Sequence, residues 1–513
     1  MASPAADSDA SVATLEANLQ KPSPRVQVVR VALVGCGAVA SVHLRSMARL
    51  NEKVLRVRFA LTAIVDPNAS RRAAVLKEAE ALSLLTYIDQ ARGRDEEKPH
   101  AAYDFLQQVR PRDFDLALLC VPHHLHEELW AYAANLAPPK HCVIEKPFAT
   151  TAAGCKAMLC DMLRASANSG DLPLFWVAEQ SAYWPEVVKA CDLIRQNAIG
   201  SLVSVHAHYY ESLVSTPFGG GSFGSDETKG TAEHDLGWRK SLDTAGGGSV
   251  MDGGLHWLRP LRMFLRANPA DSDRNCMDLE VLGSSARHLT GVEGESLCHA
   301  LIRERVRPKD QMQLQSSRAC GRCPVECTFR ATVLQRAHLT LYEDPSFRIT
   351  GQEGEILIYG GTTAPGPHCK SELRLYNREH PHGYTINPID NDSQEAAASM
   401  ADGNAKKRKL SNAIGSGAPA ECNELDGSSS SCSIPMLGFH GGYPRQWEAI
   451  AEALAKRNEA PTAEESEYEE REHMHKQCLE AANDVAIVEC IYRSLRSRQW
   501  EPVECLESVK HVQ

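Results

Sequence analysis

Six residues near the N-terminus have the composition and spacing of a phosphate-binding turn. Residues 35–40 read Gly-Cys-Gly-Ala-Val-Ala, which fits the pattern G-x-G-x-x-A. In such a turn Gly35 permits a tight bend and Gly37 lets the backbone approach a pyrophosphate, while a small third residue allows close packing of helix on strand. The amino end of the helix then offers backbone N–H groups to the anion. We therefore predict a dinucleotide-binding turn made of Gly35, Gly37, Ala38 and Val39.

An acidic residue, Asp66, follows the second apolar stretch of the chain. A carboxylate at this point accepts hydrogen bonds from ribose hydroxyls and repels a 2′-phosphate, so it favours NAD as the cofactor. The distance from the glycines exceeds the usual interval of about 20 residues, which indicates a loop insertion around residues 51–57. Arg71 and Arg72 follow closely, and because their charge suits a 2′-phosphate, NADP is an alternative.

The elements that must position these residues alternate between apolar strands and helices. Stretches that are apolar throughout, as buried strands are, occupy residues 29–34, 59–65, 114–121 and 141–145. Helical spacing of apolar residues follows at 38–50 and at 127–136. This alternation is typical of a parallel sheet covered on both faces, and a strand before the glycine turn with a helix after it is the context that the motif needs. The sequence predicts a doubly wound α/β Rossmann domain over residues 29–180.

The strand-like segments become amphipathic beyond about residue 180. Residues 202–210 alternate between apolar and polar side chains, and residues 347–359 have the pattern of a hairpin with glycines near its turn. Such alternation suits an antiparallel sheet with one packed face and one open face. The apolar residues of 482–498 predict a helix that packs on this sheet.

Two segments lack the patterns of folded structure. Residues 1–28 form a tail rich in Ala, Ser, Asp and Pro, and residues 386–436 are dominated by small and polar side chains. We predict that both are disordered. The second segment contains the basic run Lys406–Lys409, which is either a nuclear localisation signal or a solvated linker patch.

Composition limits the classes of function. The 513 residues are enough for two to three domains, and the net charge of −11 argues against nucleic-acid binding. The 17 cysteines are scattered, which favours free thiols in a reducing compartment. We see no signal peptide in the first 28 residues and no apolar run of about 18 residues. The expectation is a cytoplasmic protein without a membrane span, or a nuclear one if the basic run is a localisation signal.

Several segments together resemble one family. The chain is similar to the glucose–fructose oxidoreductase, inositol dehydrogenase and rhizopine-catabolism (Gfo/Idh/MocA) family of oxidoreductases. The segments that carry the resemblance are V-A-L-V-G-C-G-A-V-A at 31–40, V-P-H-H-L-H at 121–126, H-C-V-I-E-K-P-F at 141–148, G-W-R at 237–239 and G-G-G-S-V-M-D-G-G-L-H-W at 246–257. The resemblance implies that an α+β domain with a large open, mainly antiparallel sheet follows the Rossmann domain. We assign it residues 181–385 and 437–513, and expect a homo-dimer or homo-tetramer formed through the sheet.

The resemblance also implies which residues lie near the cofactor. Glu145 and Lys146 belong to a Glu-Lys-Pro segment where cofactor meets substrate, often with a cis peptide before the proline. A segment beneath the cofactor contains Pro122, His123 and His126. A pair that approaches the nicotinamide or the substrate consists of Trp238 and Arg239.

By the same resemblance Lys146, Asp252 and His256 are catalytic. Oxidation of an alcohol requires that a hydride leave carbon for NAD and that a proton leave the hydroxyl, and a histidine suits the second task near neutral pH. The spacing D-x-x-x-H predicts that Asp252 and His256 lie one helical turn apart, with the carboxylate holding the imidazole. Lys146 would hydrogen-bond the substrate oxygen and favour its negative charge.

These residues predict an NAD(P)-dependent oxidoreductase acting on a polyol, a sugar or a related hydroxylated small molecule. Two alternatives stand beside it: a non-catalytic regulator of the same fold that senses a dinucleotide, and a glycosidase that uses tightly held NAD. A sensor has no need of Lys146, Asp252 and His256, so their presence argues for an enzyme.

Three cysteines have a spacing that raises the question of a metal. Cys320, Cys323 and Cys327 form C-x2-C-x3-C, and His299 or His338 could complete a zinc site. There is no second C-x-x-C, and the resembled family has no metal here, so we predict none. Residues 303–332 also lack the apolar strand pattern of the family's sheet, which we interpret as an insertion or a degenerate stretch.

Overall fold

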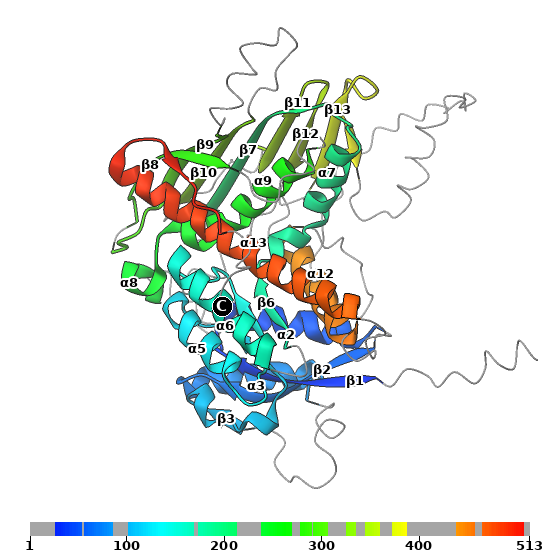
Figure 1. The fold of residues 1–513 in the computed structure, drawn as a ribbon, viewed down its shortest axis with the longest axis vertical. Helices are drawn as coiled ribbons and strands as arrows, with labels where there is room; N and C mark the ends of the chain where they lie inside the picture. Colours follow the sequence, from blue (N-terminus) through cyan, green and yellow to red (C-terminus); the bar gives the residue numbers. More distant parts are fainter. Residues whose placement is uncertain are drawn as a thin grey trace, which may run out of the picture.

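Two sheets dominate the structure and lie toward opposite ends of the molecule (Figure 1). The computed structural model describes residues 26–53, 56–85, 101–168, 173–212, 237–268, 278–289, 291–305, 325–334, 344–359, 372–386, 438–456 and 464–506. Outside these residues lie residues 1–25 of the predicted tail, nearly all of the predicted insertion with its basic run, and Cys320, Cys323 and His338. The last two residues assigned to the tail, Gln27 and Val28, belong to the first strand, so that boundary was set too late.

The first sheet is the parallel sheet of a Rossmann domain. Its six strands have the order β3-β2-β1-β4-β5-β6. They are β1 (Gln27–Val34), β2 (Val57–Val65), β3 (Ala101–Tyr103), β4 (Leu116–Leu119), β5 (His141–Glu145) and β6 (Phe175–Ala178). The strand order reverses between β1 and β4, and ligands of such sheets bind beyond the carboxyl ends of the strands at this switch point. The fold prediction is therefore confirmed for this half of the chain.

Helices cover both faces of this sheet because its strands are apolar throughout. They are α2 (Ala38–Asn51), α3 (Ala69–Ala81), α5 (His126–Ala134) and α6 (Ala152–Asn168), with the short turns η1 (Leu106–Gln108), η2 (Pro111–Asp113) and η3 (His123–Leu125). One apolar cluster joins α2 and α3 to the sheet, and a second lies under α5 and α6 and continues toward the other sheet.

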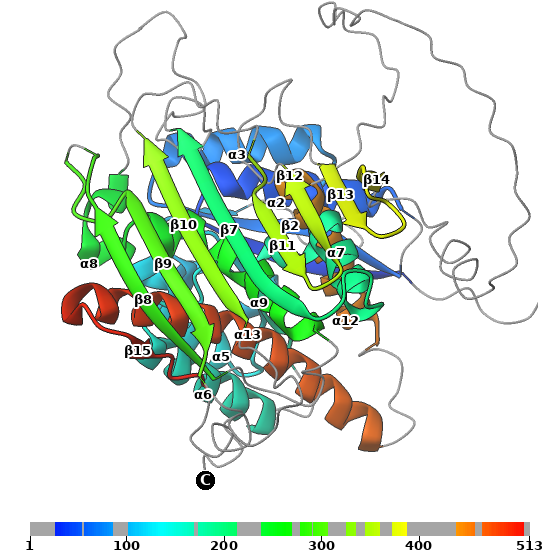
Figure 2. The same cartoon turned by 90° about the horizontal axis from the view of Figure 1, so that it is seen from above.

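The second sheet is mainly antiparallel, and its nine strands have the order β14-β13-β12-β11-β7-β10-β9-β8-β15. They are β7 (Leu202–Ser212), β8 (Leu279–Ala286), β9 (Leu297–Glu304), β10 (Glu326–Leu334), β11 (Phe347–Gly351), β12 (Gly354–Tyr359), β13 (Glu372–Asn377), β14 (Tyr384–Ile386) and β15 (Glu501–Pro502). The predicted hairpin is confirmed as β11 and β12. Figure 2 shows this sheet from above, with α9 and α13 crossing beneath it.

Our interpretation of residues 303–332 is wrong in its second half. Strand β10 occupies the centre of the sheet, parallel to β7 and antiparallel to β9. Val325, Cys327 and Phe329 alternate with Glu326 and Thr328, and only the first three are buried. The apolar pattern is therefore present, but it has period two and begins at Val325, after a stretch that lies outside the described residues.

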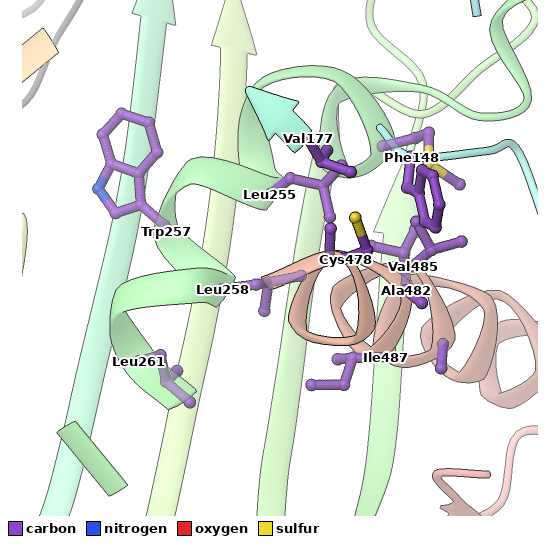
Figure 3. Packing of buried hydrophobic residues seen from close by; sticks show 14 of the residues in the cluster. Phe148, Val177, Leu255, Trp257, Leu258, Leu261, Cys478, Ala482, Val485 and Ile487 are labelled. Carbon is purple, nitrogen blue, oxygen red and sulfur yellow. The ribbon is translucent and has the colours of Figure 1, made fainter. Parts of the chain in front are cut away.

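Helices fill the space between the two sheets. They are η4 (Gln180–Tyr183), α7 (Pro185–Arg195), η5 (Gly237–Lys240), α8 (Leu242–Ala245), the π-helical turn η6 (Val250–Gly254) and α9 (Leu255–Ala267). The long helix α13 (Glu464–Ser497) extends beyond the helix predicted at 482–498 and packs on α6, β6, α9 and β8. Figure 3 shows Leu255 and Leu258 of α9 beside Cys478 and Ala482 of α13.

Buried ion pairs fix the orientation of α9 against α13. The Nε atom of Arg259 lies 2.6 Å from Oδ2 of Asp484, and Nη2 of Arg262 lies 2.7 Å from Oε2 of Glu480. Because removal of one partner from such a pair leaves an uncompensated buried charge, these contacts restrict α9 to one register. His256 lies in the first turn of this helix, so its position depends on α13.

Helix α12 (Gly438–Lys456) returns to the first sheet after the segment 387–437. It packs on α2, β2 and η4, and Trp447 and Ile450 belong to the same buried cluster as β1 and β2. We assigned these residues to the second domain from sequence, and the structure places this helix against the Rossmann sheet. Among the described residues, none of the helices has the length and apolar character needed to cross a bilayer.

Candidate active site

The glycine turn has the geometry that a bound pyrophosphate requires. Gly35 has φ of +91°, and a Cβ atom there would lie 2.1 Å from the carbonyl oxygen of Cys120. Gly37 is the N-cap of α2, no side chain caps this helix end, and a Cβ at Gly37 would meet nothing within 4 Å. Free backbone N–H groups facing open space at a helix amino end form an anion site. The residues present therefore fit the phosphates of a dinucleotide.

Asp66 lies beside this turn at the end of β2. Its Oδ2 atom accepts a hydrogen bond from the Cys36 backbone N at 2.9 Å, and its Oδ1 accepts one from Asn68 N at 2.7 Å. Arg72 turns away toward Asp104 and the Asp66 carbonyl, whereas the side chain of Arg71 is exposed. Of the two arginines considered for a 2′-phosphate, only Arg71 is thus left without an ion-pair partner among the described residues.

The segment after β4 brings three histidines to the switch point. Pro122 precedes η3, and His123 is buried with its Nδ1 atom 2.8 Å from the Ala245 carbonyl oxygen. Burial lowers the pKa of His123 well below its usual value, so this imidazole is neutral. His126 is also buried, and its ring nitrogens face the carbonyl oxygens of Pro147 (2.7 Å) and Val121 (3.2 Å). Its predicted contact with a cofactor stays a prediction, because protein groups occupy both nitrogens.

Three of the predicted site residues meet in one cluster around Asp252. Lys146, which ends the Glu-Lys segment before a cis peptide to Pro147, donates to Asp252 Oδ1 and to the Asp252 carbonyl, both at 2.8 Å. The Nε atom of Arg239 lies 2.6 Å from Asp252 Oδ2. Burial raises the pKa of the Asp252 carboxyl, but Arg239 and Lys146 outweigh it and hold the pKa well below its usual range. The cluster is therefore one carboxylate shared by two cations.

The predicted pairing of Asp252 with His256 is wrong. The Nδ1 atom of His256 lies 2.7 Å from Oε1 of Glu179, at the end of β6, and both side chains are buried. Burial raises the pKa of Glu179, but His256 and Arg259 outweigh it and lower the pKa to about 2. An ionised carboxylate only accepts hydrogen bonds, so Nδ1 carries the proton and Nε2 is left as the proton acceptor.

A local change of helix type explains the error. Residues 250–254 form a π-helical turn, and α9 begins only at Leu255. Residues four apart lie on one face in an α-helix, but the wider π turn breaks that register between Asp252 and His256. Glu295 anchors this turn, since its carboxylate accepts from Val250 N at 2.9 Å and from Gly248 N at 3.2 Å.

Trp238 and Arg239 close one side of the cluster. The Trp238 ring packs edge-on against His123, with centroids 4.4 Å apart, and the Arg239 guanidinium lies over the Trp238 ring at 4.2 Å. The Nε atom of Arg239 is engaged by Asp252, and the two terminal nitrogens of Arg239 make no hydrogen bond among the described residues. They are therefore available to a ligand.

Sequence reasoning missed the residues that hold the predicted ones. Glu145 is held by His43 and by Tyr443 of α12, so its predicted contact with a cofactor also stays a prediction. Glu179 had a usable signal, since it is an acid that directly follows the apolar strand 175–178. His43 and Tyr443 had none, because each looks like an ordinary residue on a helix face.

Comparison with known proteins agrees with this geometry. Residues 29–167 match the family model described as oxidoreductase family, NAD-binding Rossmann fold. The fold is shared with levoglucosan dehydrogenase in complex with NADH and levoglucosan, at 16% identity and a TM-score of 0.57 over 94% of this chain and 100% of that one. It is also shared with an oxidoreductase domain protein from Kribbella flavida (16%, TM-score 0.59, covering 93% and 99%) and with aldose-aldose oxidoreductase from Caulobacter crescentus complexed with glycerol (16%, TM-score 0.52, covering 92% and 99%).

The family match confirms the predictions of an oxidoreductase and of NAD as the type of cofactor, and the likeness to the solved structures confirms the two-domain fold. Residues 29–167 match the NAD-binding Rossmann domain of the Gfo/Idh/MocA family of oxidoreductases.

Proposed function

We propose that this protein is an NAD-dependent dehydrogenase that oxidises a CH–OH group of a sugar or polyol, or reduces the corresponding carbonyl. The observation that carries the proposal is the cluster of Lys146, Asp252 and Arg239 at the carboxyl edge of the Rossmann sheet, with the Glu179–His256 pair nearby. A regulator that only senses a dinucleotide needs none of these groups. When bound, NAD would accept the hydride that leaves the substrate carbon.

Lys146 is suited to bind the substrate oxygen. An ammonium group has three protons, and two of those of Lys146 are directed at Asp252. The third is free to donate to a hydroxyl or carbonyl oxygen, and the positive charge favours that oxygen as it becomes negative. Asp252 holds the ammonium in one orientation, which reduces the entropy lost when a substrate binds.

His256 is suited to take the hydroxyl proton. With Nδ1 protonated and directed at Glu179, its Nε2 atom has the lone pair that a general base requires. The Glu179 charge stabilises the imidazolium that forms on proton transfer. Glu145 of β5 pairs with Ala178 of β6, so Lys146 and Glu179, which holds His256, follow neighbouring strand ends.

A neutral substrate fits the charges of this cluster. The cluster of one carboxylate and two cations has a net charge of +1, and a dinucleotide pyrophosphate would bring negative charge to the same edge of the sheet. The levoglucosan and glycerol in the two related structures are neutral polyhydroxy compounds, which supports a substrate of this class for the chain.

The test is turnover by the purified full-length protein with a panel of sugars, sugar derivatives and polyols, measured as the absorbance of reduced nicotinamide with NAD and with NADP. We expect turnover with at least one member, and loss of more than about 10³-fold in kcat for Lys146→Met. Lys156→Met, an exposed lysine on α6 of the same domain, is the matched control and should keep wild-type activity.

Two results would overturn the proposal. Binding of NAD without turnover of any compound, in either direction, would favour a sensor. Turnover by Lys146→Met at the wild-type rate would remove Lys146 from the chemistry.

A further inference from the structure

A second buried network surrounds Glu145, the residue that precedes Lys146. The Glu145 carboxylate, which ends β5, accepts three hydrogen bonds. Its Oε1 atom lies 2.8 Å from His43 Nε2 and 3.2 Å from the Tyr443 hydroxyl, and its Oε2 lies 3.2 Å from the Lys146 backbone N. All of these side chains apart from Lys146 are buried. Of the residues in this network, Lys146 is the most exposed, and it is the one that also contacts Asp252.

Trp447 determines which nitrogen of His43 carries the proton. The indole Nε1–H of Trp447 lies 2.9 Å from His43 Nδ1, and an indole only donates hydrogen bonds. His43 Nδ1 is therefore the acceptor, and the ring proton must lie on Nε2, where it is donated to Glu145. Edge-on packing of the His43 ring against Tyr443 (5.1 Å) and Trp447 (5.8 Å) fixes the plane of the imidazole.

The charge of Glu145 is kept by these donors. Burial raises the pKa of Glu145, but the hydrogen bond from His43 and the nearby charges outweigh it and lower the pKa. Burial next to this carboxylate raises the pKa of Tyr443 well above its usual value, so the phenol keeps its proton and donates it. Each polar atom of the network thus has one role: Trp447 donates to His43, and His43, Tyr443 and the Lys146 backbone N–H donate to Glu145.

Both aromatic residues come from α12, which is remote in sequence. This helix follows the segment 387–437, and it lies close to η4 because Gly442 has no side chain; a Cβ atom there would lie 2.4 Å from Gln180 Oε1. Helix α12 therefore makes two contacts next to the candidate active site. Tyr443 reaches Glu145 at the end of β5, and Gly442 lies against η4, the turn that follows Glu179.

We propose that His43, Tyr443 and Trp447 are positioning residues for Lys146, acting through Glu145, and that α12 is consequently part of the catalytic apparatus. This inference rests on the proposed function for the role of Lys146. The carboxylate holds the Lys146 backbone N–H, and a shift of the strand end would move the ammonium relative to Asp252. A misplacement of about 1 Å costs up to about 10²-fold in rate at a site of this kind.

The test compares full-length wild type with Trp447→Phe, Tyr443→Phe and a control, Trp130→Phe. Trp130 is also buried and donates to the Met158 carbonyl at 2.9 Å, but it lies on α5 outside the network. The first readout is the rate at which an amine reagent modifies Lys146 in the protein without cofactor, followed by peptide mass spectrometry. The second is nitrogen NMR of histidine-labelled protein, which reports the tautomer of His43. The third is kcat, KM and the Kd for NAD.

We expect modification of Lys146 to become several-fold faster in both network variants and to stay at the wild-type rate in Trp130→Phe. The wild-type His43 should show a proton on Nε2, and Trp447→Phe should lose this single state. kcat should fall about 10- to 100-fold in both variants, with KM and the Kd for NAD changed less than about 3-fold.

The positioning role is contradicted if both network variants match Trp130→Phe in Lys146 modification and in kcat, with only their thermal stability lowered. A His43 proton on Nδ1 in the wild type would also contradict it. If the wild type turns over no compound in the panel, the proposed function fails, and the modification rate and the NMR signal still decide whether the network holds Lys146.

Discussion

The imidazole of His256 on α9 is held at 2.7 Å by Glu179, which follows β6, and not by Asp252 of the preceding π-helical turn. The two acids near the site therefore have separate tasks. Glu179 fixes the tautomer of His256, whereas Asp252 orients Lys146 and Arg239. Each acid can be tested independently of the other.

Glu179→Gln should reduce kcat about 10²- to 10⁴-fold with little change in KM, because the amide keeps an acceptor for Nδ1 but removes the charge that stabilises the imidazolium. Steady-state kinetics with the substrate found by the screen checks this. Ser181→Ala is the matched control, since the Ser181 hydroxyl donates to the same Glu179 oxygen at 2.6 Å and its loss leaves the carboxylate charged. An equal loss of kcat in the two variants would contradict the assignment.

Asp252→Asn should lower kcat by about 10²-fold or more, because Lys146 and Arg239 lose the carboxylate that orients them and repel one another. Loss of a partially buried ion pair should also lower stability by about 1–3 kcal/mol. Kinetics and urea unfolding measure the two effects. Activity within a few-fold of wild type would show that Lys146 does not depend on Asp252.

The sequence was informative where a residue's neighbours along the chain also determine its role. The glycine turn lies between a strand and a helix that directly adjoin it, so the local sequence of residues 29–50 was enough to predict this strand, turn and helix. The same is true of the hairpin at 347–359, whose strands pair locally.

The contacts that hold the site cross from one element to another, and no local pattern predicts them. Glu179 meets His256 from 77 positions away, and Tyr443 meets Glu145 from 298 positions away. The D-x-x-x-H spacing was misleading because it presumes an α-helix, and residues 250–254 are π-helical. Strand β10 was missed because it begins after a long stretch without an apolar pattern.

The cofactor preference should depend on Asp66. Asp66→Ser removes the charge that repels a 2′-phosphate, and Arg71 is exposed nearby to bind one. We expect the ratio of kcat/KM for NADP to that for NAD to rise by at least about 10-fold. In the double variant Asp66→Ser with Arg71→Ala most of the gain should disappear. An unchanged ratio in Asp66→Ser would show that this carboxylate does not face the ribose.

The two glycines of the phosphate turn should respond differently to alanine. Gly35→Ala combines a positive φ with a Cβ at 2.1 Å from the Cys120 carbonyl oxygen, so it should destabilise the protein by more than about 3 kcal/mol. Gly37→Ala places its methyl group in open space and should leave thermal unfolding unchanged while raising the Kd for NAD at least about 10-fold. Tight NAD binding by Gly37→Ala would show that no pyrophosphate approaches this backbone.

Stability should fall as the pH drops below 6.5, partly because of His123. Burial lowers the pKa of His123 well below the usual 6.5, so below that pH the unfolded chain binds a proton that the folded protein excludes. One such histidine costs up to about 1.4 kcal/mol per pH unit. The pKa values of Asp252 and Glu179 are lowered instead, so the stability that these two carboxylates contribute is lost only at more acidic pH.

Urea unfolding of wild type and His123→Asn at pH 6.5 and 5.5 isolates the effect of the histidine, because asparagine can still donate to the Ala245 carbonyl. The variant should lose less stability than the wild type across this interval; an equal loss would mean that His123 becomes protonated without unfolding.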